Sequence, residues 1–305
     1  MNKMNFNLKQ YLKEKQELVN LHLKMILQQY EQKRELVLAM SHSLMAGGKR
    51  LRPILSMASA EACGKNFELA LPVSCAIEMI HTYSLIHDDL PAMDNDDLRR
   101  GLPTCHKKFS EATAILAGDA LLTHAFNVMS QPEQVFKNFP NSQTRIKLIS
   151  RISQAAGIQG MVEGQMLDMQ PYQPKENDSL INHLKKIHAL KTGKMITVSV
   201  EAGALSVGAD PEMINKLVAY ADKIGLAFQV VDDILNIEGD PKIMGKAAGS
   251  DVLNDKMTFP AIIGLDESKK FAKNLVDNAL DSISLFDETA VPLRAIANYI
   301  INRDH

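Results

Sequence analysis

Apolar side chains recur every three or four positions along most of this chain, which is the spacing of amphipathic helices. Near the N-terminus, for example, Leu8, Leu12 and Leu18 follow this spacing. Helices are predicted on this basis at residues 6–30, 33–46, 53–63, 68–89, 111–130, 143–170, 177–206, 211–237, 259–284 and 289–302. Few stretches resemble strands, and no repeat or low-complexity segment interrupts the pattern. We therefore expect a single all-α domain over residues 1–305, a bundle of about ten helices.

The segment Met195–Val200 carries β-branched residues that favour a strand by propensity. The helical periodicity on both sides outweighs this weak preference, so the segment is predicted to be helical. Loops are short except at residues 98–110 and 238–258. Each of these long loops follows an acidic motif, where it would cover a bound ligand.

Composition narrows the classes of function. The chain has 305 residues, of which 46% are hydrophobic, and its 34 Lys and Arg nearly balance its 36 Asp and Glu. A net charge of −2 gives no electrostatic case for nucleic-acid binding. Cys63, Cys75 and Cys105 show no metal-binding spacing, which fits reduced thiols in a cytoplasmic protein. The polar N-terminus and the lack of an 18-residue apolar run predict neither secretion nor a membrane span.

The stretch His81–Gly101 concentrates unusual chemistry. An apolar helical run leads into five aspartates and is followed by two arginines, Arg99 and Arg100. The aspartates are Asp88, Asp89, Asp94, Asp96 and Asp97. Two like charges about 4 Å apart repel by roughly 4 kcal/mol at an effective dielectric constant of 20, so such a cluster favours dispersal into water or cations. It is either a solvated acidic turn or a site for a hard cation such as Mg²⁺, with the arginines indicating a phosphate.

A second acidic element begins after Leu226. Gln229, Asp232, Asp233 and Asn236 fall at i, i+3, i+4 and i+7, which places them on one face of a helix. An aspartate pair at the end of an apolar helix thus occurs twice in the chain. Two such helices facing each other across a bundle would hold divalent ions that bridge to a diphosphate.

A basic segment, Lys49–Pro53, follows two glycines and leads into a predicted helix. It is either a basic surface loop or, at a helix N-terminus, an anion site. An EF-hand is excluded because Leu98 and Arg99 occupy positions where a ligand and the turn glycine are required. No glycine-rich phosphate loop or dinucleotide motif is present.

Several motifs together resemble one family. They are GGKRLRP at 47–53, HDDLPAMDNDDLRRG at 87–101, KTG at 191–193, FQVVDD at 228–233, GK at 245–246 and DK at 255–256. In this order they resemble the short-chain trans-prenyl diphosphate synthases, most closely the bacterial farnesyl type. The resemblance implies the isoprenoid synthase type I fold with a central cavity, a cytoplasmic location and a homodimer.

The resemblance also implies site residues. The metal ligands expected for Mg²⁺, three ions with a bound diphosphate, are Asp88, Asp94 and Asp232, with Asp89 and Asp233 in support. The isopentenyl diphosphate site is expected at Lys49, Arg52, His81 and Arg100. The allylic diphosphate contacts are expected at Arg99, Lys191, Thr192, Gln229, Lys246 and Lys256, among which Lys191, Thr192 and Gln229 are the catalytic candidates. Asp96 and Asp97 are expected to be solvated or paired with the arginines. Asn236 departs from the family pattern, which has aspartate there, so one ion is expected to bind more weakly.

The implied reaction condenses isopentenyl diphosphate head to tail with dimethylallyl and then geranyl diphosphate to give (2E,6E)-farnesyl diphosphate. On the helix that leads to Asp88, Tyr83 and Ser84 are the candidates that limit chain length. A geranylgeranyl diphosphate synthase carries a similar motif and is the main alternative. A class I terpene cyclase has no use for a second anion site, and a non-catalytic subunit would lose parts of the metal motifs. The role of Arg303, near the C-terminus, is left open: it either closes over the isopentenyl site or, as position alone favours, lies in a frayed, solvated tail.

Overall fold

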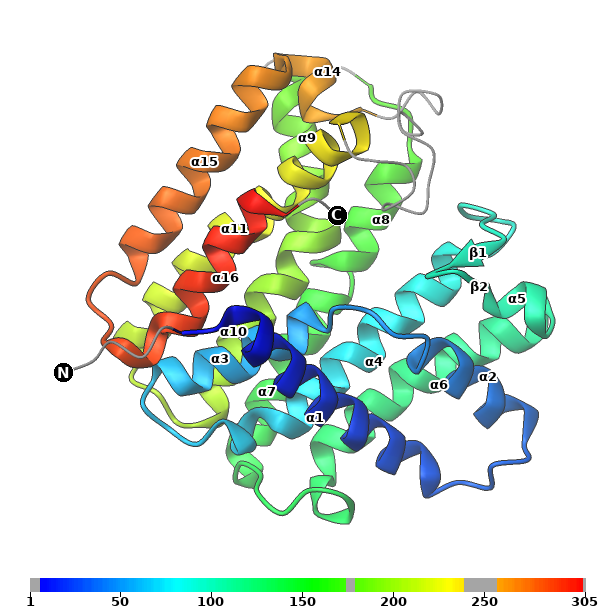
Figure 1. Cartoon of the computed structure of the whole chain (residues 1–305). Helices are drawn as coiled ribbons and strands as arrows, with labels where there is room; N and C mark the ends of the chain where they lie inside the picture. Colours follow the sequence, from blue (N-terminus) through cyan, green and yellow to red (C-terminus); the bar gives the residue numbers. More distant parts are fainter. Residues whose placement is uncertain (1–5, 174–178, 239–256, 304–305) are drawn as a thin grey trace.

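The structure is a computed structural model that describes residues 6–173, 179–238 and 257–303. Its longer helices are α1 (Leu8–Gln28), α2 (Glu35–Leu44), α3 (Leu51–Ala62), α4 (Leu71–Asp88), α6 (Glu111–Ser130), α7 (Ser142–Ala156), α8 (Met161–Met169), α9 (Leu180–His188), α10 (Lys194–Ser206), α11 (Pro211–Glu238), α15 (Leu265–Ser282) and α16 (Val291–Asn302). Shorter helical segments are η1 (Phe67–Ala70), α5 (Cys105–Lys108), η2 (Pro132–Gln134), η3 (Ala189–Gly193), α14 (Phe259–Ile263) and η4 (Glu288–Ala290). The predicted all-α class is confirmed (Figure 1).

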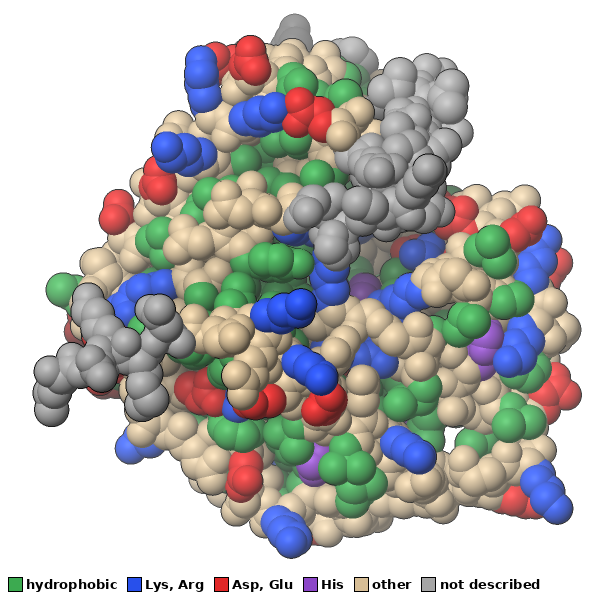
Figure 2. Space-filling model, in the orientation of Figure 1, with side chains coloured by type: hydrophobic (Ala, Val, Ile, Leu, Met, Phe, Trp, Pro, Cys, Tyr) green, Lys and Arg blue, Asp and Glu red, His purple; other side chains and the backbone are tan. Residues whose placement is uncertain are grey.

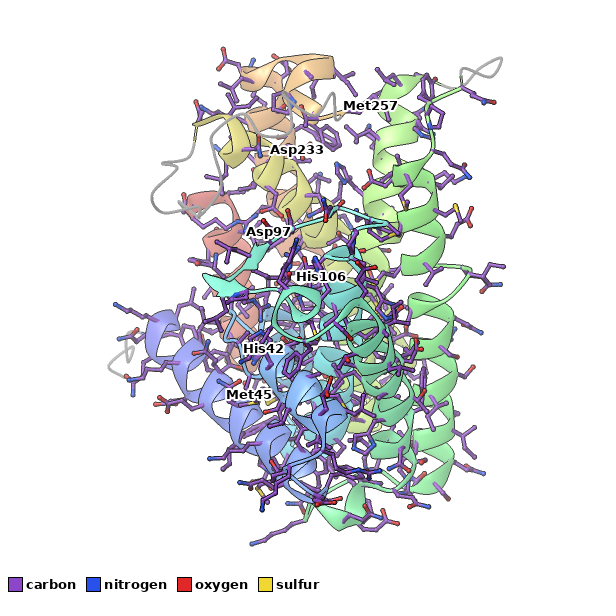
Figure 3. All side chains as sticks on the ribbon, turned by 90° about the vertical axis from the view of Figure 1, so that its right-hand side faces the viewer. His42, Met45, Asp97, His106, Asp233 and Met257 are labelled. Carbon is purple, nitrogen blue, oxygen red and sulfur yellow. The ribbon has the colours of Figure 1, made fainter. Side chains whose placement is uncertain are left out.

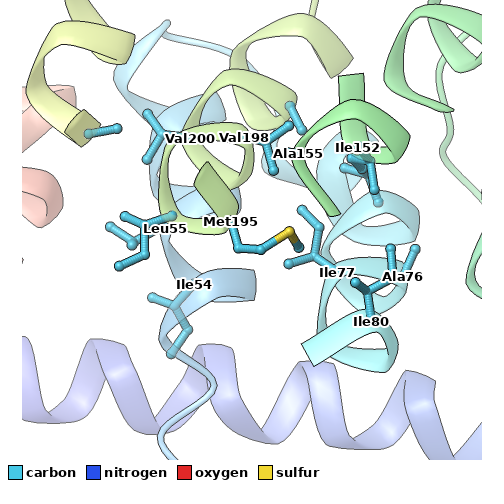
Figure 4. Packing of buried hydrophobic residues seen from close by; sticks show 14 of the residues in the cluster. Ile54, Leu55, Ala76, Ile77, Ile80, Ile152, Ala155, Met195, Val198 and Val200 are labelled. Carbon is cyan, nitrogen blue, oxygen red and sulfur yellow. The ribbon is translucent and has the colours of Figure 1, made fainter. Parts of the chain in front are cut away.

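The core is built around α10, which packs against α3, α7 and α11. Every residue from Met195 to Val200 is buried, and the segment is helical as predicted. Figure 4 shows Met195 between Leu55 of α3 and Ile77 of α4. Burial of the β-branched side chains on all sides of α10 explains why the helix forms against their intrinsic preference.

The structure differs from several of the predicted boundaries, and the helix expected at 177–206 consists of α9, η3 and α10. The helix expected at 143–170 is two helices, because α7 ends at Ala156 and α8 begins at Met161. Glycines flank the break, and glycine is a poor helix former. The helix expected at 259–284 breaks at Gly264, whose φ of 84° lies in the left-handed region that glycine tolerates. Within the expected loop 98–110, strands β1 (Leu98–Arg99) and β2 (Leu102–Pro103) pair antiparallel and α5 follows.

The helices that carry the two aspartate motifs are held by different neighbours. α4 packs mainly against α6 and α3, whereas α11 packs mainly against α15 and α10. In Figure 1, α15 and α16 cover one side of α11, and α1 crosses in front of α3 and α4. The two motifs therefore end on separate, independently supported helices.

Two described helices are long and apolar enough to cross a membrane by length and composition alone, Phe67–Asp88 and Glu111–Ser130. In the first, 78% of the most apolar window is buried inside the protein, and in the second 39%. Core helices of soluble proteins meet the same two criteria, so the criteria are weak evidence for a span. Burial accounts for the apolar composition of α4.

Candidate active site

The first aspartate motif begins where α4 ends. Asp88 is the last residue of α4 and Asp89 is its C-cap. The backbone amide of Asp94 donates a hydrogen bond of 2.8 Å to the carbonyl oxygen of Asp88, which closes the turn after the helix. Burial raises the pKa of the Asp88 carboxyl to about 6, with a further contribution from Asp94, whereas Lys191 opposes the rise. A carboxylate in this environment is stabilised by an added cation.

Asp89 differs from Asp88 because it already has a cationic partner. The side chain of Asp89 is buried, and its Oδ1 accepts a hydrogen bond of 2.6 Å from Nε of Arg99 on β1. Burial raises the pKa of Asp89, and Arg99 opposes this rise. Arg99 also lies 3.3 Å from Asp96, as expected, whereas Asp97 pairs with Lys107 instead of an arginine. The hairpin thus directs Arg99 toward the end of α4.

The second motif forms a chain of hydrogen bonds. Oγ1 of Thr192 donates to Oε1 of Gln229 over 3.1 Å, and Nε2 of Gln229 donates to Oδ2 of Asp232 over 3.0 Å. Oδ1 of Asp232 accepts a hydrogen bond from the guanidinium of Arg303. These hydrogen bonds therefore connect η3, α11 and the residue that follows α16. They bring the catalytic candidates Thr192 and Gln229 together with Asp232, a predicted metal ligand.

Asp233 and Asn236 have different surroundings. Oδ2 of Asp233 accepts a hydrogen bond of 2.9 Å from the backbone amide of Phe259, the first residue of α14. Asn236 is buried one turn beyond Asp232. Of the polar residues predicted on one face of α11, Gln229 and Asp232 are thus linked to Thr192, whereas Asp233 contacts α14.

Arg303 is buried, so the expectation of a solvated tail was wrong. Its side chain is 4% exposed. One guanidinium nitrogen donates to the carbonyl oxygen of Phe228 over 3.0 Å, and the guanidinium carbon lies 3.9 Å from the centre of the Phe228 ring. The cation–π contact and the ion pair with Asp232 together fix the end of the chain against α11.

Lys191 has a partner that the sequence interpretation missed. Its Nζ lies 2.6 Å from Oδ2 of Asp168 on α8. Lys191 and Thr192 belong to η3, a turn of π-helix, a geometry often found at functional sites. A Cβ at Gly164 would lie 2.1 Å from the backbone nitrogen of Lys191, so only glycine lets α8 approach this turn. The pair spans 23 positions, so no local spacing signals it.

Arg50, in the middle of the basic segment, is a structural residue. Its side chain is fully buried, and Nη1 lies 2.6 Å from Oε1 of Glu78 on α4. The same guanidinium donates to Asn20 and to the carbonyl oxygen of Leu44. The charge of Arg50 is therefore paired with Glu78 inside the protein. Arg50 is not among the predicted anion-binding residues.

Arg52 and Arg100 both lie close enough to His81 to affect the pKa of its imidazole. Burial lowers the pKa of Arg52, Glu78 and Asp232 oppose this fall, and Arg100 adds to it. The pKa of His81 lies well below its ordinary value because of burial and the neighbouring arginines, so this imidazole is neutral. Nε of Arg52 is buried without a hydrogen-bond partner. Such an orphaned donor among like charges is suited to binding an anion.

Arg100 is positioned by the two glycines before Lys49. One nitrogen of its guanidinium donates to the carbonyl oxygen of Gly47. A Cβ at Gly48 would lie 2.5 Å from the guanidinium carbon, so the absence of a side chain there makes room for Arg100. Lys49 and Arg303 both line a cavity of about 700 Å³ beside α1 and α16. Figure 2 shows a hollow in the middle of the face that is turned toward the viewer, with Lys and Arg side chains around it.

The two motifs and the cations near them influence one another electrostatically. Lys191 lowers the pKa of Asp88 across the gap between η3 and α4. Burial raises the pKa of Asp232, while Arg303 and Lys49 lower it. Each motif therefore has a carboxylate that lies close enough to a cation on another element for the charge of that cation to lower its pKa.

The donor set is suited to Mg²⁺, although it is incomplete by itself. Carboxylate oxygens are hard ligands, and the half-buried Asp88 would gain from a nearby cation. Among the described residues, no three His, Cys, Asp or Glu side chains are grouped so as to hold a metal ion. Lys246 and Lys256 lie outside the described residues.

The two chain-length candidates lie within α4. Tyr83 is 7% exposed, and its ring packs edge-on against His87 with the ring centres 5.7 Å apart. Nε2 of His87 lies 3.0 Å from the carbonyl oxygen of Ile115, which places this face of α4 against α6. Oγ of Ser84 donates to the carbonyl oxygen of His81 over 2.9 Å. The large ring of Tyr83 and the small side chain of Ser84 thus occupy consecutive positions about one turn before Asp88.

Comparisons with known proteins agree with this geometry. The polyprenyl synthetase family model matches residues 33–290. A farnesyl diphosphate synthase from Geobacillus stearothermophilus is 46% identical over 98% of this chain and 99% of its own. A geranylgeranyl diphosphate synthase from Cyanophora paradoxa is 43% identical over 99% and 98%. The crystal structure of an FPP/GFPP synthase from Zymomonas mobilis, without ligands, superimposes with a TM-score of 0.81 at 38% identity, covering 97% of this chain and 99% of its own. The chain therefore belongs to the polyprenyl synthetase family of prenyltransferases and has the all-α fold of isoprenoid synthases.

Proposed function

We propose that this protein makes (2E,6E)-farnesyl diphosphate by adding isopentenyl diphosphate to dimethylallyl and then geranyl diphosphate. The observation that carries the proposal is Tyr83, a buried ring one turn before Asp88 that would limit the depth available to a growing chain. The full-length similarity to the Geobacillus farnesyl diphosphate synthase supports it. The comparable similarity to a geranylgeranyl diphosphate synthase makes a twenty-carbon product the second candidate.

Asp88, Asp94 and Asp232 would hold the metal ions. Three ions would be bound when the diphosphate is present. Mg²⁺ supplies positive charge that stabilises the diphosphate as it leaves the allylic carbon. Arg99 and Lys191 add fixed positive charge from the hairpin and from η3, together with Lys246 and Lys256 outside the described residues. Because this charge opposes charge that develops as the C–O bond breaks, it acts on the transition state.

Thr192 and Gln229 would face the allylic carbocation. Their mutual hydrogen bond fixes the orientation of both side chains, so their oxygen dipoles do not have to reorganise during the reaction. Lys49, Arg52, His81 and Arg100 would bind the diphosphate of the second substrate without metal. The isopentenyl double bond then attacks the cation, a carbon–carbon bond forms, and the released diphosphate accepts the proton that the product loses.

An exposed apolar surface supports a homodimer. Large apolar side chains are exposed on α6 and on the α7–α8 segment: Ile115, Leu116, Ile158, Val162 and Met166. α6 packs beside α7, so these side chains belong to neighbouring elements. An apolar surface of this kind is typical of a protein–protein interface. Light scattering of the purified protein tests this directly, and Leu116→Asp is expected to shift a dimer toward monomer.

The function is tested by incubating the purified protein with Mg²⁺, isopentenyl diphosphate and each allylic primer in turn, then identifying the products by mass. A fifteen-carbon product confirms the proposal, and a mainly twenty-carbon product favours the second candidate. A cyclised hydrocarbon from the allylic substrate alone would indicate a terpene cyclase. No turnover with any primer would indicate a non-catalytic subunit.

A further inference from the structure

Asp233 is next to Asp232 in sequence but has different contacts. Its side chain is buried, and Oδ2 accepts the amide hydrogen of Phe259 over 2.9 Å. Phe259 is the first residue of α14 and is fully buried. Figure 3 shows Asp233 on α11, on the same side of the molecule as Met257, which leads into α14. The carboxylate thus holds the point where the chain re-enters the bundle.

His188 extends this contact to the π-helical turn. Its ring stacks on Phe259 with the ring centres 5.6 Å apart, and its Nε2 lies 3.5 Å from Oδ2 of Asp233. His188 is the last residue of α9 and directly precedes η3, which carries Lys191 and Thr192. Asp233, Phe259 and His188 therefore join α11, α14 and the start of η3 in one buried cluster.

The contacts of the two aspartates assign them different tasks. Successive residues on a helix point about 100° apart, so adjacent carboxylates do not face the same space. Asp232 faces Gln229 and Arg303, and its side chain is 42% exposed. A divalent ion that took the place of the Phe259 amide at Oδ2 of Asp233 would leave a buried donor unpaired, which is unfavourable.

We infer that Asp233 is a positioning residue, and not a metal ligand, of the prenyl transfer proposed above, on which this inference rests. Its carboxylate fixes the first turn of α14 and, through Phe259 and His188, the turn that presents Lys191 and Thr192 to the allylic substrate. The essential property of Asp233 is then a hydrogen-bond acceptor in the right place. Its negative charge is secondary.

Asparagine separates the two roles because its Oδ1 can accept the Phe259 amide but carries no charge. We compare Asp233→Asn with Asp233→Leu, which removes the acceptor, and with Asp232→Asn. Asp277→Asn, on the exposed face of α15, controls for loss of one charge. The first measurement is Mn²⁺ binding in the presence of inorganic pyrophosphate, followed by electron paramagnetic resonance. The second is amide hydrogen exchange of segments 257–263 and 189–193 by mass spectrometry.

Asp233→Asn is expected to keep Mn²⁺ affinity within about threefold of the unmodified protein, whereas Asp232→Asn loses about tenfold or more. Asp233→Leu is expected to raise the hydrogen exchange of both segments and to lower kcat more than it changes KM. In Asp233→Asn, exchange and kcat are expected to be close to those of the unmodified protein. Equal losses of Mn²⁺ affinity in Asp232→Asn and Asp233→Asn would overturn the inference, even where the leucine variant does not fold.

Unchanged exchange in a folded Asp233→Leu variant would equally overturn it. If the unmodified protein binds no Mn²⁺ with pyrophosphate, the proposed function fails instead. In that case, the amide hydrogen exchange of segments 257–263 and 189–193 in the Asp233→Leu and Asp233→Asn variants alone decides whether Asp233 anchors α14 and η3.

Discussion

Arg303 occupies one oxygen of Asp232, the carboxylate that is proposed to hold a metal ion. The guanidinium therefore acts as a counter-ion of this carboxylate. Because Asp232 is 42% exposed, the ion pair is partly screened by water and contributes about 1 kcal/mol. A divalent ion that binds Oδ1 of Asp232 has to displace the guanidinium of Arg303.

Replacing Arg303 by glutamine is expected to strengthen metal binding by about fivefold, which corresponds to the free energy of the lost ion pair. The measurement is Mn²⁺ binding with inorganic pyrophosphate. Lys273→Gln, on the exposed face of α15, removes one positive charge elsewhere and is expected to have no effect. Equal Mn²⁺ affinity in Arg303→Gln and in the unmodified protein would show that the pair does not compete with the metal.

Alanine at Asp88 or Asp232 removes a charged ligand from the proposed metal site. Since metal binding there acts mainly on the leaving diphosphate, the loss is expected in kcat and amounts to at least about a hundredfold. Steady-state rates at low millimolar Mg²⁺ test this. Asp277→Ala serves as the control, and near-normal turnover in either site variant would refute the assignment.

Asn236 lies one turn beyond Asp232, where the family pattern has an aspartate. A carboxylate binds a hard cation better than an amide does, so Asn236→Asp is expected to lower the Mg²⁺ concentration at half-maximal rate. The test is a Mg²⁺ titration of the rate at saturating substrates. If both proteins give the same titration curve, the side chain at 236 makes no contribution to metal binding.

Tyr83 is expected to limit the chain at fifteen carbons. Tyr83→Ala should therefore yield some product of twenty carbons or more, and Ser84→Phe should shift products toward ten. Products are identified by mass, with circular dichroism as the control for folding. If Tyr83 serves only in packing, the alanine variant loses a few kcal/mol of stability and its products stay at fifteen carbons.

Gly164 allows α8 to approach the Lys191 turn. A methyl group there would overlap the backbone of Lys191, so Gly164→Ala is expected to lower the free energy of unfolding by about 1–3 kcal/mol. Gly225→Ala is the comparison, because a Cβ at Gly225 would lie 3.3 Å from Cα of Gly193 and requires a smaller shift. Denaturant unfolding measures both. A smaller loss at Gly164 than at Gly225 would contradict the steric explanation.

Local patterns predicted the fold well because helices leave a periodic signal in the sequence. The all-α class and the helical state of Met195–Val200 are confirmed. The break between α7 and α8 was missed because a short glycine-flanked turn hardly alters the apolar period. Boundaries of this kind depend on how neighbouring helices pack, which the sequence pattern does not report.

The site was predictable to the extent that its residues cluster in the sequence. The aspartates and the basic segment form local motifs, whereas Asp168 pairs with Lys191 from a different helix. Arg303 was expected in solvent because it is close to the C-terminus, and its contact with Asp232 spans 71 positions. Contacts at such separations are set by tertiary packing and leave no spacing that a single sequence displays.

The buried pair of Arg50 and Glu78 has a consequence for substrate binding. Arg50 adopts a left-handed backbone conformation, with φ of 51°, between the glycines and α3, and its side chain is fixed by three separate acceptors. The segment that presents Lys49 and Arg52 is therefore ordered before any anion arrives. A preorganised site loses little conformational entropy on binding, so if Lys49 and Arg52 bind the second diphosphate as proposed, the free energy of their charge contacts is retained as affinity.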